Sequence, residues 1–263
     1  MSAPPITADR VTSALAGTLK SMVKGLGGDA FVRLAGDAAL IVTRVPFPTM
    51  NGVLMMRPRV APDVIEELLR DPALASTVHA VQVRPGCSPD VTSMLERRGM
   101  HEDEPIPLMA MPSPTEALKR AADVPKLEIG VIDPSDAQLH GLIAAEGFQV
   151  PAEMFDSFAK PSVLAQPGMR TYVGKVDGRP VTTAICVRID DYAGIFDVAT
   201  PPAYRGRGYG AAVTARATLD GFDSGATFAF LQSSPMGLAV YERLGFRTLE
   251  TWSVWISDLP SHS

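Results

Sequence analysis

The sequence predicts a mixed α/β fold, of the α+β kind, built from two similar units in tandem. Three observations support this prediction. The chain has 263 residues, about twice the commonest domain size. Short apolar runs typical of strands alternate with helical patterns along its length. The segment 95–100 resembles the segment 241–246, and in both places a strand and a helix precede it and an apolar strand follows.

The first unit is expected at residues 1–111. Its strand-like runs are residues 30–34, 38–45, 53–56, 78–83 and 106–111. Its helical patterns cover residues 9–23, 62–70 and 89–97. Residues 112–125 are expected to connect the two units, because prolines cluster around a short helical stretch at 115–122.

The second unit is expected at residues 126–263 and repeats the order of the first. Its strand-like runs are residues 127–131, 171–176, 181–189, 194–199, 227–231 and 251–256. Its helical patterns cover residues 135–145, 152–159, 208–222 and 236–244.

A glycine-rich loop, Arg205-Gly206-Arg207-Gly208-Tyr209-Gly210, joins the strand at 194–199 to a long helix. The first turn of a helix offers unpaired N–H groups and the positive end of its dipole, which suit a phosphate. Glycines let the backbone approach an anion closely, and the two arginines add positive charge. The loop therefore predicts a phosphate site, the alternative being glycines that only permit close helix packing. Residues 57–62 of the first unit contain no such loop, so one copy of the site is expected.

Two other phosphate-binding motifs fit less well. The P-loop is excluded because neither Gly-Lys-Ser nor Gly-Lys-Thr occurs in the chain. Gly206, Gly208 and Ala211 formally match a dinucleotide fingerprint. However, the next strand runs into Leu231-Gln232-Ser233, without the carboxylate that this motif needs.

The whole segment resembles the pyrophosphate-binding loop of the GNAT superfamily of acyl-CoA-dependent N-acyltransferases, in which Arg-x-x-Gly-x-Gly follows a strand. Residues 127–256 show the order of elements of that family, and residues 241–246 resemble its second signature. The resemblance implies two GNAT-like units, each a twisted, mostly antiparallel sheet flanked by helices, with the first unit degenerate. This layout is similar to that of the mycothiol synthases. It also implies acetyl-CoA as co-substrate and direct attack of an amine on the thioester.

The resemblance assigns the coenzyme contacts residue by residue. Val198, Ala199 and Thr200 match the stretch whose backbone pairs with the pantetheine arm. The stretch around the pyrophosphate comprises Arg205, Gly206, Arg207, Gly208, Tyr209, Gly210 and Ala211. Ser234 stands where many relatives have asparagine.

Two residues are expected to carry proton transfer. Tyr241 matches the phenol that protonates the departing thiolate, the alternative being a tyrosine that only packs against coenzyme A. Leu95, at the matching position of the first unit, indicates that the fold itself needs no hydroxyl there. Asp197 is the candidate base for the substrate ammonium, although strand alternation could equally direct it to solvent or into a structural salt bridge.

Three further residues are expected near the acceptor amine: Glu146, Phe148 and Gln232. Each has a simpler alternative. Glu146 could be a solvated helix end, and Phe148 falls at helical spacing with Phe155 and Phe158, as a core residue would. Gln232 can hydrogen-bond a substrate but cannot take a proton.

Composition excludes several other functions. The 24 Lys and Arg against 29 Asp and Glu give a net charge of −5, which argues against nucleic acid as a partner. No run of about eighteen apolar residues predicts a membrane span. Cys87 and Cys186 are far apart and the histidines show no metal-ligand spacing, so neither a disulfide nor a metal site is expected.

The resemblance implies an N-acetyltransferase with a small-molecule amine as acceptor, the composition adds a cytoplasmic location, and a homodimer stays open. Two other functions stay open at this point. One is a noncatalytic acyl-CoA sensor, and the other is an enzyme that acetylates protein lysines or N-termini.

Overall fold

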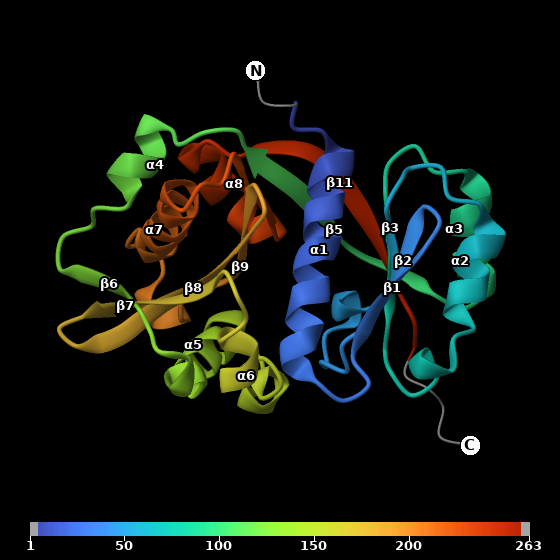
Figure 1. The fold of residues 1–263 in the computed structure, drawn as a ribbon, viewed down its shortest axis with the longest axis horizontal. Coiled ribbons are helices and arrows are strands. Elements are labelled where there is room, and N and C mark those ends of the chain that lie inside the picture. The colour runs from blue at the N-terminus through green and yellow to red at the C-terminus, as the bar shows by residue number, and fades with distance from the viewer. Residues whose placement is uncertain (1–4, 259–263) are drawn as a thin grey trace.

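Residues 5–258 of this computed structural model form two lobes that share one eleven-stranded sheet (Figure 1). The strand order is β1-β2-β3-β4-β11-β5-β10-β9-β8-β7-β6. The first half of the chain supplies α1 (Ala8–Leu26), β1 (Phe31–Ala35), β2 (Ala38–Val42), β3 (Asn51–Met55), α2 (Pro62–Leu69), β4 (Ala80–Val83), α3 (Pro89–Arg97) and β5 (His101–Met111).

The second half of the chain repeats this order with two extra helices and one extra strand. It supplies α4 (Glu116–Ala121), β6 (Leu127–Val131), α5 (Ala137–Phe148), α6 (Pro161–Leu164), β7 (Met169–Val176), β8 (Arg179–Ile189), β9 (Tyr192–Ala199), α7 (Tyr209–Asp223), β10 (Phe228–Gln232), α8 (Pro235–Leu244) and β11 (Arg247–Ile256). The predicted mixed, mostly antiparallel sheet flanked by helices is confirmed.

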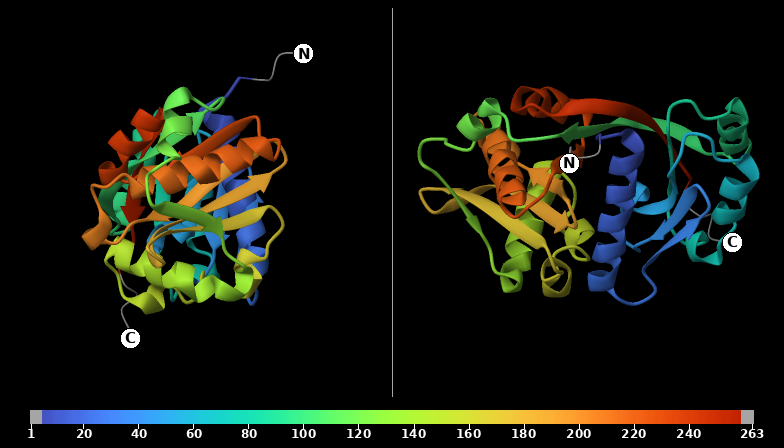
Figure 2. Two further views of the ribbon diagram at one scale, coloured as in Figure 1. Left: turned by 90° about the vertical axis from the view of Figure 1, so that its left-hand side faces the viewer. Right: turned by 45° about the horizontal axis from the view of Figure 1, so that its top comes forward.

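The two lobes exchange their last strands. In each lobe one neighbouring pair is parallel, β3 with β4 and β9 with β10. The strand that closes the first half, β5, pairs with β10 of the second lobe, and β11 pairs with β4 of the first. Figure 2 shows β5 and β11 running side by side from one lobe to the other, paired antiparallel. Strand pairing therefore crosses the predicted connector at residues 112–125.

One hydrophobic cluster runs through both lobes on the face of the sheet that α1, α5 and α6 cover. It joins Leu15 of α1 and Leu54 of β3 to Ile185, Phe230 and Trp252 of the second half. On the opposite face, α2 and α3 cover one cluster in the first lobe, and α4, α7 and α8 cover another in the second. Because the first cluster is continuous, the lobes share a core.

Two predicted elements differ most from the structure. The helix expected at residues 152–159 is wrong: a 3-10 turn at Ala152–Phe155 is followed by the separate helix α6. Lys160 is extended (φ −106°, ψ 135°) because the next residue, Pro161, disfavours the helical region. Strand β5 begins five residues before the expected start at 106. Its first residues are polar and exposed, so the apolar pattern used for the prediction does not include them.

The expected connector also contains part of the second core. Its short helix is α4, and Leu118 on that helix is fully buried against the cluster under α7 and α8. Among residues 5–258, no helix is both long enough and apolar enough to cross a bilayer.

Candidate functional site

The sheet of the second lobe opens between β9 and β10. Hydrogen bonding between them ends at the pair Gly194 and Phe230, although both strands continue. Beyond this point β9 carries a bulge, where its register with β8 shifts between Thr183 and Ile185. Asp197 lies in the bulge with a φ of 49°, a left-handed conformation that is uncommon for a residue with a side chain. A bulge bends its strand, and the part of β9 that carries this bulge lies beyond its last pair with β10.

The glycine-rich loop leads from the end of β9 into α7. Gly206 has a φ of 75° and Gly208, the N-cap of α7, a φ of 82°. No side chain caps this helix, and its first backbone bond is from the Ala212 N–H to the Gly208 carbonyl. A Cβ built on Gly206 would meet no atom within 4 Å. The space beside Gly206 is therefore open, and the first-turn amides of α7 have no side-chain cap, as at helix starts that bind anions.

A cavity of ≈ 370 Å³ lies between this loop and α8. The predicted residues that line it are Thr200, Arg205, Gly206, Gly208, Tyr209, Gly210 and Ala211. The lining does not include Val198, Ala199, Arg207 or Ser234. Tyr204, Met236, Val240 and Arg243 complete it and were missed in the sequence. The spacing of the last three, on one face of a helix, is the signal that could have found them.

The two loop arginines differ in their contacts. Arg205 donates to the carbonyls of Thr200 (3.1 Å from Nε) and Gly147 (from Nη2), so it fastens the loop to the end of α5. Arg207 donates to the Ala203 carbonyl at 3.3 Å and lies over the ring of Tyr204. It lines a neighbouring cavity of ≈ 370 Å³, which also contains Arg179 and shares Tyr204 and Tyr209 with the first.

Tyr241 lies inward on α8. Its ring packs edge-on against Phe246, with centroids 6.2 Å apart. Burial raises the pKa of its phenol to about 12. Within residues 5–258 its hydroxyl makes no hydrogen bond, so at neutral pH the side chain is a protonated donor without a protein acceptor.

Asp197 faces α5 from the bulge. Its Oδ2 lies 3.6 Å from Nε2 of His140, which is fully buried. Neither atom has a hydrogen-bond partner in the described part of the chain. On the other side of the ring, His140 Nδ1 lies 2.8 Å from Oγ1 of Thr183. Sequence reasoning assigned His140 no role, because nothing in its local pattern links it to a residue 57 positions away.

The remaining predicted residues lie in different settings. Ser234 caps α8, its Oγ accepting from the Gly237 N–H at 3.2 Å. Gln232 donates to Oε1 of Gln82, from the matching strand of the first lobe, at 3.0 Å. Glu146 is exposed at the end of α5.

Phe148 is 47% exposed and stacks on Phe155, with ring centroids 5.8 Å apart. Phe155 and Phe158 are buried. Core packing, which the helical spacing suggested for all three phenylalanines, therefore applies to these two.

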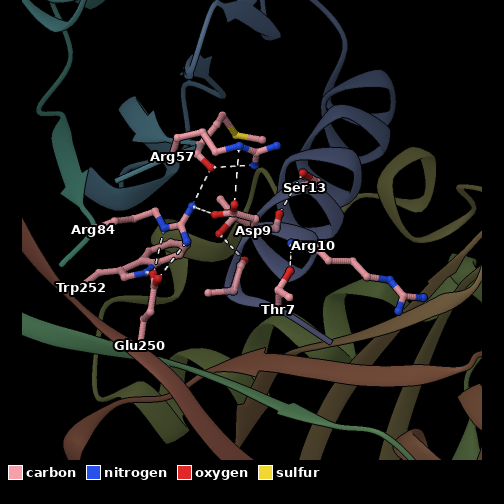
Figure 3. Close-up of polar contacts among 11 residues, drawn as sticks. Thr7, Asp9, Arg10, Ser13, Arg57, Arg84, Glu250 and Trp252 are labelled. Carbon is pink, nitrogen blue, oxygen red and sulfur yellow. Dashed lines mark hydrogen bonds and ion pairs between the residues drawn. The ribbon is translucent and has the colours of Figure 1, made fainter. Parts of the chain in front are cut away.

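In the first lobe β3 and β4 stay paired up to Leu54 and Gln82, and Arg84 lies just past their ends (Figure 3). This side chain is 1% exposed and lies just beyond β4. It makes two 2.8 Å bonds to Glu250, donates to the Met56 carbonyl at 2.6 Å, and pairs with Asp9 at 2.7 Å. Trp252 donates to the same Glu250 carboxylate at 2.9 Å. Through the Met56 carbonyl, Arg84 links the residue after β4 to the residue after β3.

The loop that follows β3 also differs from its counterpart. Residues 57–61 contain no glycine, and α2 begins with Pro62, which has no N–H to offer an anion. Within residues 5–258, no group of three or more His, Cys, Asp or Glu side chains could hold a metal ion.

Comparisons with known proteins agree with this geometry. The family model described as "Acetyltransferase (GNAT) family" matches residues 137–246, which include the loop and Tyr241. No curated protein sequence matches the chain significantly.

Several solved structures share the fold over almost the whole chain. A GCN5-related N-acetyltransferase from Kribbella flavida is 21% identical, with a TM-score of 0.69 over 95% of both chains. A GCN5-related N-acetyltransferase-like protein from Streptococcus suis is 13% identical, with a TM-score of 0.55 over 94% of this chain and 98% of that one. A tandem GNAT protein from the clavulanic acid biosynthesis pathway is 12% identical, with a TM-score of 0.57 over 98% of both. Residues 137–246, in the second half of the chain, therefore match the GNAT acetyltransferase family, and the chain shares its overall fold with these solved structures.

Proposed function

We propose that the second lobe binds acetyl-CoA and transfers its acetyl group to a primary amine of a small molecule by direct attack. The observation that carries this proposal is the uncapped, glycine-lined start of α7, which lies beside the opening between β9 and β10 and borders a cavity closed by α8. A diphosphate held by backbone amides needs free space beside the loop, and a Cβ on Gly206 would meet no atom within 4 Å.

In this proposal each element of the lobe has one task. The amides at the start of α7 hold the diphosphate, and the backbone of residues 198–200 pairs with the pantetheine arm. Bound coenzyme supplies the activated acetyl group. Alignment of the amine with that group provides much of the rate.

Two side chains then handle the protons. An alkyl ammonium titrates near 10.4, so removing its proton at pH 7 costs about 4–5 kcal/mol without a base. Asp197 takes this proton. Tyr241, which its raised pKa keeps protonated, donates to the departing thiolate.

We also propose that the first lobe binds no acyl-CoA. Arg84 is bonded to Met56 and Glu250 at the ends of β3 and β4, and the loop after β3 lacks both the glycines and the free N–H of the second lobe. The expected stoichiometry is one coenzyme per chain.

Calorimetry of the full chain with coenzyme A tests the binding site. Wild type should bind one equivalent. Gly206→Ala should weaken binding tenfold or more, because a Cβ at this φ strains the loop and narrows the approach to the amides. Gly99→Ala is the matched control: Gly99 has a φ of 76°, is equally open, and lies in the first lobe. Absence of binding, or equal losses in the two variants, would refute the proposed site.

A screen for free thiol released from acetyl-CoA tests the reaction. Small amines, amino acids, aminoglycosides and peptides are offered separately, and at least one small amine should be acetylated. Release with peptides alone would support protein acetylation instead. Binding of coenzyme A without release in any arm would favour the sensor.

A further inference from the structure

We propose that Asp197 and His140 share one proton and act as a single proton acceptor, in which His140 positions and supports Asp197. The inference rests on the proposed function and adds a residue from α5 to it. It follows from hydrogen-bond directions, burial and the bulge in β9.

The hydroxyl of Thr183 determines which nitrogen of His140 carries hydrogen. Thr183 donates its one proton to the Tyr172 carbonyl at 2.8 Å. Toward His140 Nδ1, also at 2.8 Å, Thr183 must therefore accept. The neutral ring is the Nδ1–H tautomer, and its bare Nε2 is directed at Asp197.

Two buried acceptors consequently face each other. Nε2 of His140 and Oδ2 of Asp197 are 3.6 Å apart, and neither has a hydrogen-bond partner among the described residues. Two lone pairs in this position are unfavourable, whereas one proton held between the groups satisfies both. The two groups together can therefore accept and hold one proton.

The bulge is what brings the carboxylate to the histidine. Phe196 packs against the core cluster on the α5 face, and Val198 packs against the cluster on the α7 face. Regular alternation would place Asp197 opposite Phe196, yet Asp197 reaches His140 on the same face. The left-handed φ at Asp197 accompanies this departure, as expected where local strain serves a site.

The surroundings of α5 leave the pair without a competing charge. Among the described residues, no acid other than Asp197 lies within ion-pair distance of His140. The strand β8 contributes the uncharged Thr183, and the phenol of Tyr172 on β7 bonds Asp220 on the far face. The acids of the two adjacent 3-10 turns, Asp136, Glu153 and Asp156, are exposed.

The reaction then balances as follows. Asp197 accepts one proton from the substrate ammonium, and His140 Nε2 shares it. The C–N bond forms as the C–S bond of the thioester breaks. Tyr241 protonates the thiolate and regains a proton from the nitrogen. The shared proton leaves to solvent, so each turnover yields one amide, one thiol and one proton.

Nitrogen NMR of the histidine-labelled full chain tests the geometry without activity. The chain has four histidines, and His140→Gln identifies the signal of the one on α5. Wild type should show the Nδ1–H tautomer when the ring is neutral. Thr183→Ser should keep it, and Thr183→Val, which removes the acceptor, should lose it. A neutral Nε2–H tautomer in wild type would overturn the inference.

Kinetics with an accepted amine test the catalytic part. Asp197→Asn should lower kcat about 100-fold and His140→Gln about tenfold. The dependence of kcat/KM on pH should differ between wild type and His140→Gln, because the imidazole no longer shares the proton. Affinity for coenzyme A should be unchanged in His140→Gln, which separates this effect from loss of structure.

The two possible failures are distinguishable. A wild-type chain that acetylates no amine would refute the proposed function. Wild-type acetyl transfer whose kcat and pH profile are indifferent to His140→Gln would refute the shared proton alone.

Discussion

At the scale of single residues, the guanidinium of Arg84 links its own segment to three others, through Asp9, Met56 and Glu250. Removing one partner of a buried ion pair leaves the other charge uncompensated. Arg84→Met should therefore lower the free energy of unfolding by about 3–5 kcal/mol, measured by urea denaturation.

Two further variants make this measurement specific. Arg70→Met breaks the exposed pair with Glu66 and should lower the free energy of unfolding by less than about 1 kcal/mol. The double variant Arg84→Met with Glu250→Gln should recover part of the loss, because neither charge stays buried alone. Equal effects of Arg84→Met and Arg70→Met would contradict the assigned role of Arg84.

Tyr241 is the second residue whose environment makes a prediction. A general acid acts in its protonated form, which is present below its pKa and lost above it. Since burial raises the pKa of Tyr241 to about 12, activity should not fall through loss of this proton between about pH 8 and pH 10. Tyr241→Phe should lower kcat about 100-fold at all these pH values. An alkaline limb near pH 10 that disappears in Tyr241→Phe would show that the phenol is not shielded.

At the scale of elements, the end of α5 is pressed against the end of β9. A Cβ on Gly147 would lie 2.7 Å from the Ala199 Cβ and 3.0 Å from the Thr200 nitrogen. Gly147→Ala should therefore destabilise the chain by about 1–3 kcal/mol. It should also weaken coenzyme A binding, because Arg205 bonds the Gly147 carbonyl and moves with α5. Calorimetry and urea denaturation give the two readings, with Gly130→Ala, an open position on β6, as the neutral control.

The sequence predicts most elements, because their boundaries depend on neighbouring residues. Helix α3 begins at Pro89 as expected, after the capping Ser88. The loop around Gly206 could be recognised for the same reason, since all its parts are contiguous. The spacing of Met236, Val240 and Arg243 marks one face of α8, but the sequence does not indicate which segment that face packs beside. The pairing of Asp197 with His140 also depends on a contact between distant segments and could not be predicted.

At the scale of the whole molecule, the halves depend on each other through β5 and β11. A fragment of residues 126–263 lacks β5, so the edge of β10 and part of the common core would be exposed. This fragment alone should aggregate or self-associate. Co-expressed with residues 1–125, it should form a 1:1 complex, observed by size exclusion with light scattering. A folded, monomeric 126–263 fragment would contradict this dependence.

The repeat in the sequence predicts two similar units but not the exchange between them. The similarity of segments 95–100 and 241–246 indicates that each half ends in a similar helix and strand. Similar strands can close either half, and only the pairing of β5 with β10 and β11 with β4 distinguishes the two arrangements.

The exchange has a consequence for how such a chain can evolve. A deletion that discarded the first half of the gene would also remove the edge on which the remaining half closes. Selection for a folded second half therefore also preserves the first half, whether or not the first half binds a ligand.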